Sequence, residues 1–192
     1  MPRPIPRPLL ASLLALIALG LPVPSSASSG AAAEPLATIA ALDVPRYMGE
    51  WFEIARYANR FQRKCVGDTR AEYSLKENGR LRVVNRCREE DGKISEAVGE
   101  ARQIGGPTSP RLEVRFAPAW LSFIPAVWGD YWIVDLDPAY GLVAISEPTR
   151  TYLWVLSRSP RVAPADYEAL LQRLRAKGFD TDKLLRAVHT GA

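Results

Sequence analysis

The sequence predicts an all-β fold, a small closed β-barrel of eight short antiparallel strands followed by one α-helix. Eight runs with period-two alternation recur at spacings of about ten residues, which is typical of an antiparallel barrel or sandwich. A Gly49-x-Trp51 sequence opens the first run, and the aromatic last run ends in Arg158. This pair favours a barrel with one plugged end.

The first 27 residues are expected to be a secretory signal peptide that is not part of the fold. Arg3 and Arg7 form a basic start, residues 9–21 carry no charge, and Ser25-Ser26-Ala27 offers small residues for cleavage. A retained membrane anchor is the alternative, but the run is shorter than the roughly 20 residues that a spanning helix needs. We therefore expect an exported protein.

Composition predicts one domain after this peptide. Residues 28–42 are rich in Ala, Ser and Gly and are expected to form a flexible leader, while residues 43–192 form the domain. With 192 residues in total and 47% of them hydrophobic, the chain can bury a core. Without Arg3 and Arg7, 23 basic residues face 21 acidic ones, and they are interspersed. A nucleic-acid partner is therefore excluded.

The elements follow in order. Asp43 is placed to cap a short helical turn that ends at Tyr47, before the barrel begins. The eight strands are expected near residues 51–58, 68–76, 80–87, 94–104, 111–116, 131–135, 142–146 and 152–157. Asn78-Gly79 predicts a tight hairpin with positive φ angles. Small residues at Ala97 and Gly99 permit a strong bend in the fourth strand, or a bulge at Gly99.

A C-terminal helix is expected to open near residues 163–166 and to end at Gly178. Its apolar residues recur at helical spacing and comprise Tyr167, Leu170, Leu171 and Leu174. Such a stripe is expected to pack on the outside of the sheet, in preference to a membrane or partner role.

Two cysteines, Cys65 and Cys87, flank a predicted hairpin. In an oxidising compartment a disulfide is favoured, and it would stabilise the fold by roughly 3 kcal/mol. The alternative, Cys65 as a nucleophile, lacks a base, because the only histidine is His189.

Four sequence segments resemble the lipocalins, in particular the bacterial outer-membrane lipoprotein lipocalins and apolipoprotein D. They are Tyr47-x-Gly49-x-Trp51-Phe52-Glu53-Ile54-Ala55-Arg56, Tyr73-Ser74-Leu75 with Asn78-Gly79, Asp137-x-x-Tyr140 with Ala144, and Leu153-Trp154-Val155-Leu156-Ser157-Arg158-x-Pro160. The resemblance implies an eight-stranded antiparallel up-and-down β-barrel with a C-terminal α-helix on the outside. It also implies structural roles for Gly49, Trp51 and Arg158, with the guanidinium over the indole.

Alternation places a set of side chains inside the barrel, where about one small ligand fits. The candidates are Tyr73, Val83, Leu112, Val114, Phe116, Tyr131, Ile133 and Trp154. The resemblance implies the same role for Tyr73, Phe116, Tyr131 and Trp154, and Tyr152 shares the parity of Trp154. The alternative is a barrel filled solid by these side chains. Arg88 is a candidate partner for a polar head group, or is simply solvated.

The segment from Ala117 to Gly129 carries no charge, which is unusual for a loop. Three interpretations remain open: a lid over the barrel, a membrane contact through Trp120, Phe123 and Trp128, or a dimer contact.

The expected function is binding and storage or transport of a fatty acid, lysophospholipid or similar lipid. The alternatives are a lipocalin-type enzyme acting on a lipophilic substrate and a filled-barrel module that binds a partner. We expect no catalysis, no cofactor and no metal site, because the motifs lack a metal-ligand cluster and a nearby histidine. We expect a monomer or weak homodimer, periplasmic or secreted and at most peripheral to the outer membrane, because no lipid-anchor Cys follows the signal peptide.

Overall fold

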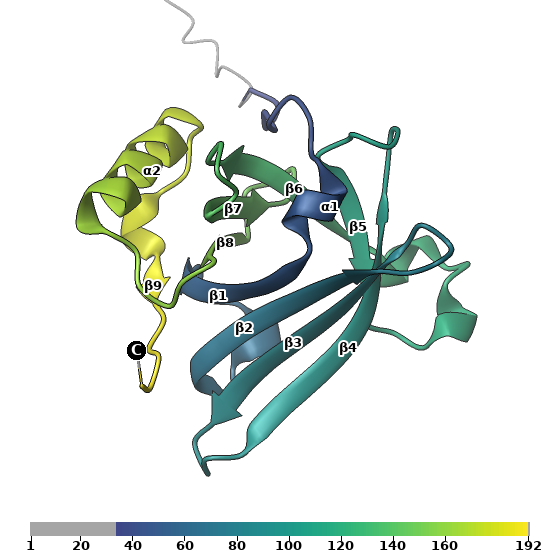
Figure 1. The fold of residues 1–192 in the computed structure, drawn as a ribbon, viewed down its shortest axis with the longest axis horizontal. Coiled ribbons are helices and arrows are strands. Elements are labelled where there is room, and N and C mark those ends of the chain that lie inside the picture. The colour runs from purple at the N-terminus through teal and green to yellow at the C-terminus, as the bar shows by residue number, and fades with distance from the viewer. Residues whose placement is uncertain (1–33, 192) are drawn as a thin grey trace, which may run out of the picture. The chain divides into compact units, whose positions relative to one another are not determined.

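Residues 34–191 are described by a computed structural model, in which an antiparallel sheet closes into a barrel (Figure 1). The barrel strands are β1 (Gly49–Arg56), β2 (Cys65–Leu75), β3 (Leu81–Glu89), β4 (Ile94–Gln103), β5 (Arg111–Arg115), β6 (Gly129–Leu136), β7 (Leu142–Ser146) and β8 (Leu153–Ser157). All eight expected strands are present. The expected signal peptide, residues 1–27, lies outside the described residues.

Closure of the sheet rests on β1, which pairs with β2 through its first half and with β8 through its second half. Gly49 lies opposite Tyr73 in β2, and Phe52 lies opposite Ser157 in β8. A ninth strand that the sequence did not predict, β9 (Leu185–Arg186), extends the sheet beside the end of β1. The up-and-down barrel is therefore confirmed, and the sandwich alternative does not apply.

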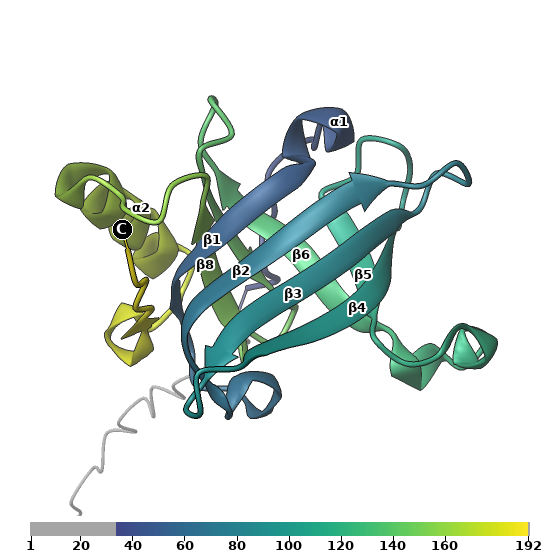
Figure 2. The same cartoon turned by 60° about the horizontal axis from the view of Figure 1, so that its bottom comes forward.

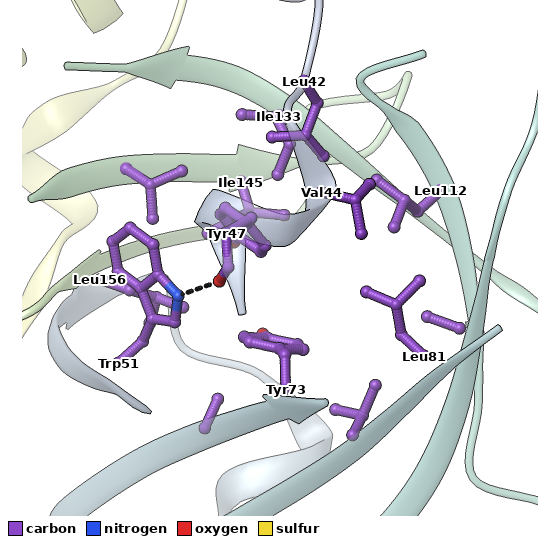
Figure 3. Close-up of a cluster of buried hydrophobic side chains, with 14 residues drawn as sticks. Leu42, Val44, Tyr47, Trp51, Tyr73, Leu81, Leu112, Ile133, Ile145 and Leu156 are labelled. Carbon is purple, nitrogen blue, oxygen red and sulfur yellow. Dashed lines mark hydrogen bonds between the residues drawn. The ribbon is translucent and has the colours of Figure 1, made fainter. Parts of the chain in front are cut away.

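The interior of the barrel is apolar at the end where β1 begins (Figure 3). Trp51, Leu112 and Ile133 are among the fully buried side chains of this cluster. The short helix α1 (Val44–Tyr47) covers this end, and the Asp43 side chain accepts a hydrogen bond from the Arg46 amide, which confirms the expected cap. We call this end the closed end.

The segment before Asp43 differs from the expectation of a flexible leader through residue 42. Leu36 is 3% exposed and Leu42 is 1% exposed. The Ile39 amide donates to the Ile133 carbonyl, and the Leu42 amide donates to the Thr108 carbonyl. Isolated apolar side chains without periodicity gave no sign of this packing in the sequence. The packed unit therefore begins at about Pro35.

The β2–β3 turn is tight, but its geometry differs from the expected one. The Gly79 amide donates to the Lys76 carbonyl, and Gly79 has a φ of 76°, whereas Asn78 does not have a positive φ. A three-residue loop needs only one left-handed residue, so the Asn78 side chain instead accepts from the Arg80 amide. The β3–β4 pairing is unbroken through Gly99, so the bulge alternative at Gly99 does not apply.

The helix α2 (Pro164–Ala176) packs on the outside of the barrel against β6, and its buried side chains share one cluster with residues of β1, β7 and β8 (Figures 1 and 2). Leu170 and Leu174 are fully buried there, and Gly178 follows the helix with a φ of 82°. Arg173 forms a bidentate ion pair with Asp135 of β6. The expected outer helix and its apolar stripe are confirmed. No helix within residues 34–191 has the length and hydropathy of a membrane span.

Four short 3-10 turns complete the described part of the chain. They are η1 (Arg60–Gln62), η2 (Ala119–Leu121), η3 (Pro125–Val127) and η4 (Thr181–Lys183). The first lies at the end of the barrel opposite α1 (Figure 2). We call this end the mouth. It is formed by the loops at residues 57–64, 90–93, 116–128 and 147–152.

Candidate functional site

The closed end is sealed by Trp51 and Arg158. The Arg158 guanidinium carbon lies 3.9 Å from the centroid of the buried Trp51 ring. The Trp51 Nε1 donates to the Tyr47 carbonyl at 2.8 Å (Figure 3). Gly49 has a φ of 96°, and a Cβ added there would lie 3.3 Å from Arg158 Nη1. These residues form the floor of the barrel, and other side chains line its interior.

Three tyrosines stand above this floor. The Tyr131 hydroxyl lies 2.7 Å from the Tyr47 hydroxyl and 2.9 Å from the Tyr73 hydroxyl. Burial raises the pKa of all three phenols, that of Tyr73 to about 12. Their polar atoms therefore stay protonated and satisfy one another inside an apolar surrounding.

The aliphatic candidates and Trp154 divide into two levels. Val83, Leu112 and Ile133 are at most 2% exposed and belong to the packed cluster of the closed end. Val114 and Trp154 are only partly buried and lie against that cluster. The closed half of the barrel is thus filled by protein, and accessible interior surface lies nearer the mouth.

The inner face of β4 carries small side chains toward the mouth. Ala101 and its partner Leu81 are buried in the interior cluster, so alternation places Gly99, Ala97 and Ser95 on the same inner face. Ala97 is nevertheless exposed and Ser95 is half-buried. Part of this inner face is therefore exposed to solvent near the mouth.

Phe116 lies apart from the other candidates. Its ring packs on β4 at Gly99, where an added Cβ would come within 2.7 Å of its Cδ1 atom. The side chain is 44% exposed, and it also borders a surface hollow of about 390 Å³. Because β5 ends at Arg115, the part of β4 before Glu100 has no β5 partner. Phe116 thus marks an edge of the barrel wall.

Aromatic side chains cover another part of the mouth. Tyr152 stacks on Trp154 with ring centroids 5.7 Å apart, and Phe61 of η1 lies 5.5 Å from Tyr152. The Trp154 Nε1 donates to Gln62 Oε1 at 2.9 Å. The η1 turn is thereby fixed across the β8 side of the mouth.

A polar group inside the barrel was missed from the sequence. Glu53 is 1% exposed, and its carboxylate accepts from Arg56 Nη1 at 2.7 Å and from Gln62 Nε2 at 2.6 Å. Burial raises the pKa of Glu53, and the bonds from Gln62 and Arg56 oppose that rise. Glu53 shares the parity of Trp51, so alternation alone could have placed it inside. Arg56 could not be placed so, because the pairing with β8 shifts between Glu53 and Ala55.

Arg88 is neither free for a ligand nor simply solvated. Its Nε donates to Asp68 Oδ2 at 2.7 Å, and Asp68 also accepts from the backbone and side chain of Thr190. Burial acts to raise the pKa of Asp68, but the bonds from Thr190 and Arg88 outweigh it and lower the value to about 2. This pair ties the C-terminal segment to β2.

The cysteines form the expected disulfide between Cys65 in β2 and Cys87 in β3. The expectation that no histidine lies near the motif segments is wrong, because His189 Nε2 lies 2.7 Å from the Glu53 carbonyl oxygen. The ring also meets Phe52 edge-on. Chain distance concealed this contact, since the C-terminal segment returns to β1 through β9.

The uncharged segment 117–129 projects beside β4 and β5, away from α2 (Figure 2). Trp128 anchors it: its ring lies 4.2 Å from the Arg102 guanidinium carbon, and its Nε1 donates to the Ser122 carbonyl. Trp120 and Phe123 are 72% and 77% exposed. The segment is thus fixed on the outer wall and presents two large apolar side chains to solvent.

Residues 42–189 match the family model of the lipocalin-like domain. The chain belongs to the lipocalin family. This confirms the resemblance in the four sequence segments, and members of this family generally bind small hydrophobic ligands.

Three curated relatives illustrate the match. The lipocalin is 39% identical over 145 residues to temperature-induced lipocalin-1 of Arabidopsis thaliana, covering 74% of this chain and 77% of the relative. It is 34% identical over 151 residues to outer membrane lipoprotein Blc of Escherichia coli K12, covering 78% and 81%. It is 32% identical over 149 residues to mouse (Mus musculus) apolipoprotein D, covering 74% of each chain.

Solved structures show the same fold at lower identity. Apocrustacyanin C1 superposes with a TM-score of 0.61 at 16% identity, covering 78% of this chain and 81% of that chain. Insecticyanin from the tobacco hornworm Manduca sexta gives a TM-score of 0.62 at 15% identity, covering 83% and 86%. These likenesses establish the barrel and carry no information about the ligand.

Proposed function

We propose that this lipocalin binds and stores or carries a fatty acid, lysophospholipid or similar lipid in the mouth half of its barrel. The observations that support this most directly are the exposure of Ala97 on the inner face of β4 and the partial burial of interior aromatic side chains such as Trp154. The other candidate lining residues are Tyr73, Val83, Leu112, Val114, Phe116, Tyr131 and Ile133, of which the most buried would form the floor under the ligand.

The energetics suit this role. Burying each methylene contributes about 0.8 kcal/mol, so roughly ten methylenes supply ample driving force. Association costs of several kcal/mol reduce the net to an expected dissociation constant near the micromolar range.

A pair of neighbouring substitutions tests the location of the ligand. Ala97→Trp would fill the inner face of β4, whereas Val98→Trp adds the same ring to the outer face, where Val98 is 49% exposed. Titration of oleic acid followed by tryptophan fluorescence or calorimetry should show that A97W weakens binding at least tenfold and V98W leaves it within twofold. Absence of binding by the wild type, together with no copurifying lipid by mass spectrometry, would support the filled-barrel alternative and overturn the proposal.

We further propose that the protein is a carrier without catalytic activity. Cys65 is held in a disulfide with Cys87, so it cannot act as a thiolate. His189 faces a backbone carbonyl of β1. Turnover of a lipophilic epoxide or isomerisable lipid by the purified protein would contradict this assignment.

The exposed loop supports a proposed contact with a lipid surface, from which ligand could be collected. Trp120 and Phe123 project from a segment without charge, a composition suited to the membrane interface. Flotation with phosphatidylcholine vesicles should recover the wild type more than a Trp120→Ser/Phe123→Ser variant. Equal recovery would leave a lid or a dimer contact as the role of the loop, and sedimentation of both proteins would separate those two. Export to the periplasm or medium remains our proposal, consistent with a relative named as an outer membrane lipoprotein.

A further inference from the structure

Two charged side chains of β1 face the inside of the barrel. Glu53 lies opposite Leu156 of β8, a member of the interior cluster, and Arg56 lies opposite Trp154, which packs against that cluster. Cross-strand partners share a face of the sheet. The register shift between Glu53 and Ala55 therefore brings both charges to one face, although they are three residues apart.

The pair is buried and only partly satisfied. The side chains of Glu53 and Arg56 are 2% and 15% exposed. Both Glu53 oxygens are bonded, one to Arg56 and one to Gln62, and Gln62 in turn accepts from Trp154. The guanidinium, by contrast, makes a side-chain bond only through Nη1, and its buried Nε has no hydrogen-bond partner among the described residues.

An unpartnered donor of this kind is costly in a purely structural role. A buried N–H without an acceptor loses its hydration without replacement, and buried polar groups are otherwise almost always paired. A guanidinium presents its donors as a rigid fork that matches a carboxylate or phosphate with two parallel bonds. The Nε edge of Arg56 is therefore chemically suited to an anionic oxygen pair.

We propose that Arg56 is the anchor for the anionic head group of an amphiphile in the barrel mouth, and that Glu53 limits how tightly that anion is held. This inference rests on the proposed lipid-binding function and adds the residue that would hold an anionic head group, a carboxylate or a phosphate, and the residue that would oppose it. Because Glu53 already occupies one edge of the guanidinium, an entering anion brings a second negative charge to the same cation. Removing the Glu53 charge should therefore favour the ligand.

The experiment compares two probes that differ only in the head group, oleic acid and oleyl alcohol, by displacement of an uncharged fluorescent reporter below their aggregation limits. Arg56→Met should weaken the binding of oleic acid at least tenfold and the binding of oleyl alcohol less than twofold. Arg82→Met is the matched control, because Arg82 is an exposed arginine of β3 on the opposite face from buried Val83. It removes the same charge and should change neither affinity.

Glu53→Gln should strengthen the binding of oleic acid severalfold and leave the affinity for oleyl alcohol unchanged. The double variant E53Q/R56M removes both buried charges and avoids leaving Glu53 buried alone, so it keeps the test valid if R56M folds poorly. It should bind both probes alike. Equal losses of acid and alcohol in R56M and in the double variant, or unchanged discrimination in both, would overturn the anchor. If the wild type binds neither probe, the proposed carrier function itself fails.

Discussion

Arg158 holds its guanidinium over Trp51 by bonds to main-chain carbonyls and not by an ion pair. Its Nη1 donates to the Glu50 carbonyl at 2.8 Å, and its Nη2 donates to the Arg46 and Met48 carbonyls at 2.9 and 2.7 Å. No carboxylate within residues 34–191 forms a salt bridge with it. The last residues before and within β1 are thereby fastened to the residue after β8, so the floor and the closing seam of the barrel depend on one side chain.

Substitution of Gly49 should test how tightly Arg158 is held against the start of β1. Gly49→Ala introduces a Cβ at a φ of 96° and 3.3 Å from Arg158 Nη1, whereas Gly79→Ala introduces one at a φ of 76° with no atom within 4 Å. Both variants incur the left-handed strain of about 1–2 kcal/mol, and only the first also displaces Arg158. Urea unfolding should show G49A to be less stable than G79A by about 1 kcal/mol or more. Equal losses of free energy of unfolding would show that Arg158 moves aside at no measurable cost.

The disulfide between Cys65 and Cys87 should stabilise the β2–β3 pair. A cross-link with a sequence separation of 22 contributes about 3 kcal/mol in the chain-entropy account. We expect the Cys65→Ala/Cys87→Ala variant to lose about that much free energy of unfolding. The unreduced wild type should show no thiol labelling under denaturing conditions, and stoichiometric labelling would contradict the bridge.

Particular residues show how far the sequence could predict this fold. Alternation and turn residues located all eight barrel strands, although β7 is buried along its whole length, and the four sequence segments identified the family. Alternation along one strand could not predict features that depend on how two strands pair. Arg56 faces inward only because the pairing of β1 with β8 shifts, and Phe116 lies at an edge because β5 stops at Arg115. Leu36 and His189 were missed because their partners are distant in sequence, and no local pattern encodes such contacts.

Stability should depend on pH through Asp68. Its pKa is about 2 in the folded protein against 3.8 ordinarily, so the contribution is complete above pH 4 and is lost as pH falls toward 2. The side chain is 19% exposed, and solvent screening reduces the expected effect to about 1 kcal/mol. Asp68→Asn should therefore destabilise the protein at pH 7 but not near pH 2. Asp91→Asn, at an exposed pair with Lys93, should be close to neutral at both.

The three interior tyrosines should show unequal costs on loss of a hydroxyl. Tyr131→Phe removes the shared partner of Tyr47 and Tyr73 and leaves two buried hydroxyls without it, whereas Tyr73→Phe leaves the Tyr47–Tyr131 bond in place. Each unsatisfied buried group costs about 1–3 kcal/mol, so Y131F should lose more free energy of unfolding than Y73F by at least 1 kcal/mol. In the Y131F background, adding Y73F removes one orphaned hydroxyl and should recover stability, a non-additivity that a double-mutant cycle measures directly. Additive losses would mean that a neighbouring group or water satisfies the hydroxyls independently, and the tyrosines would then not act as one network.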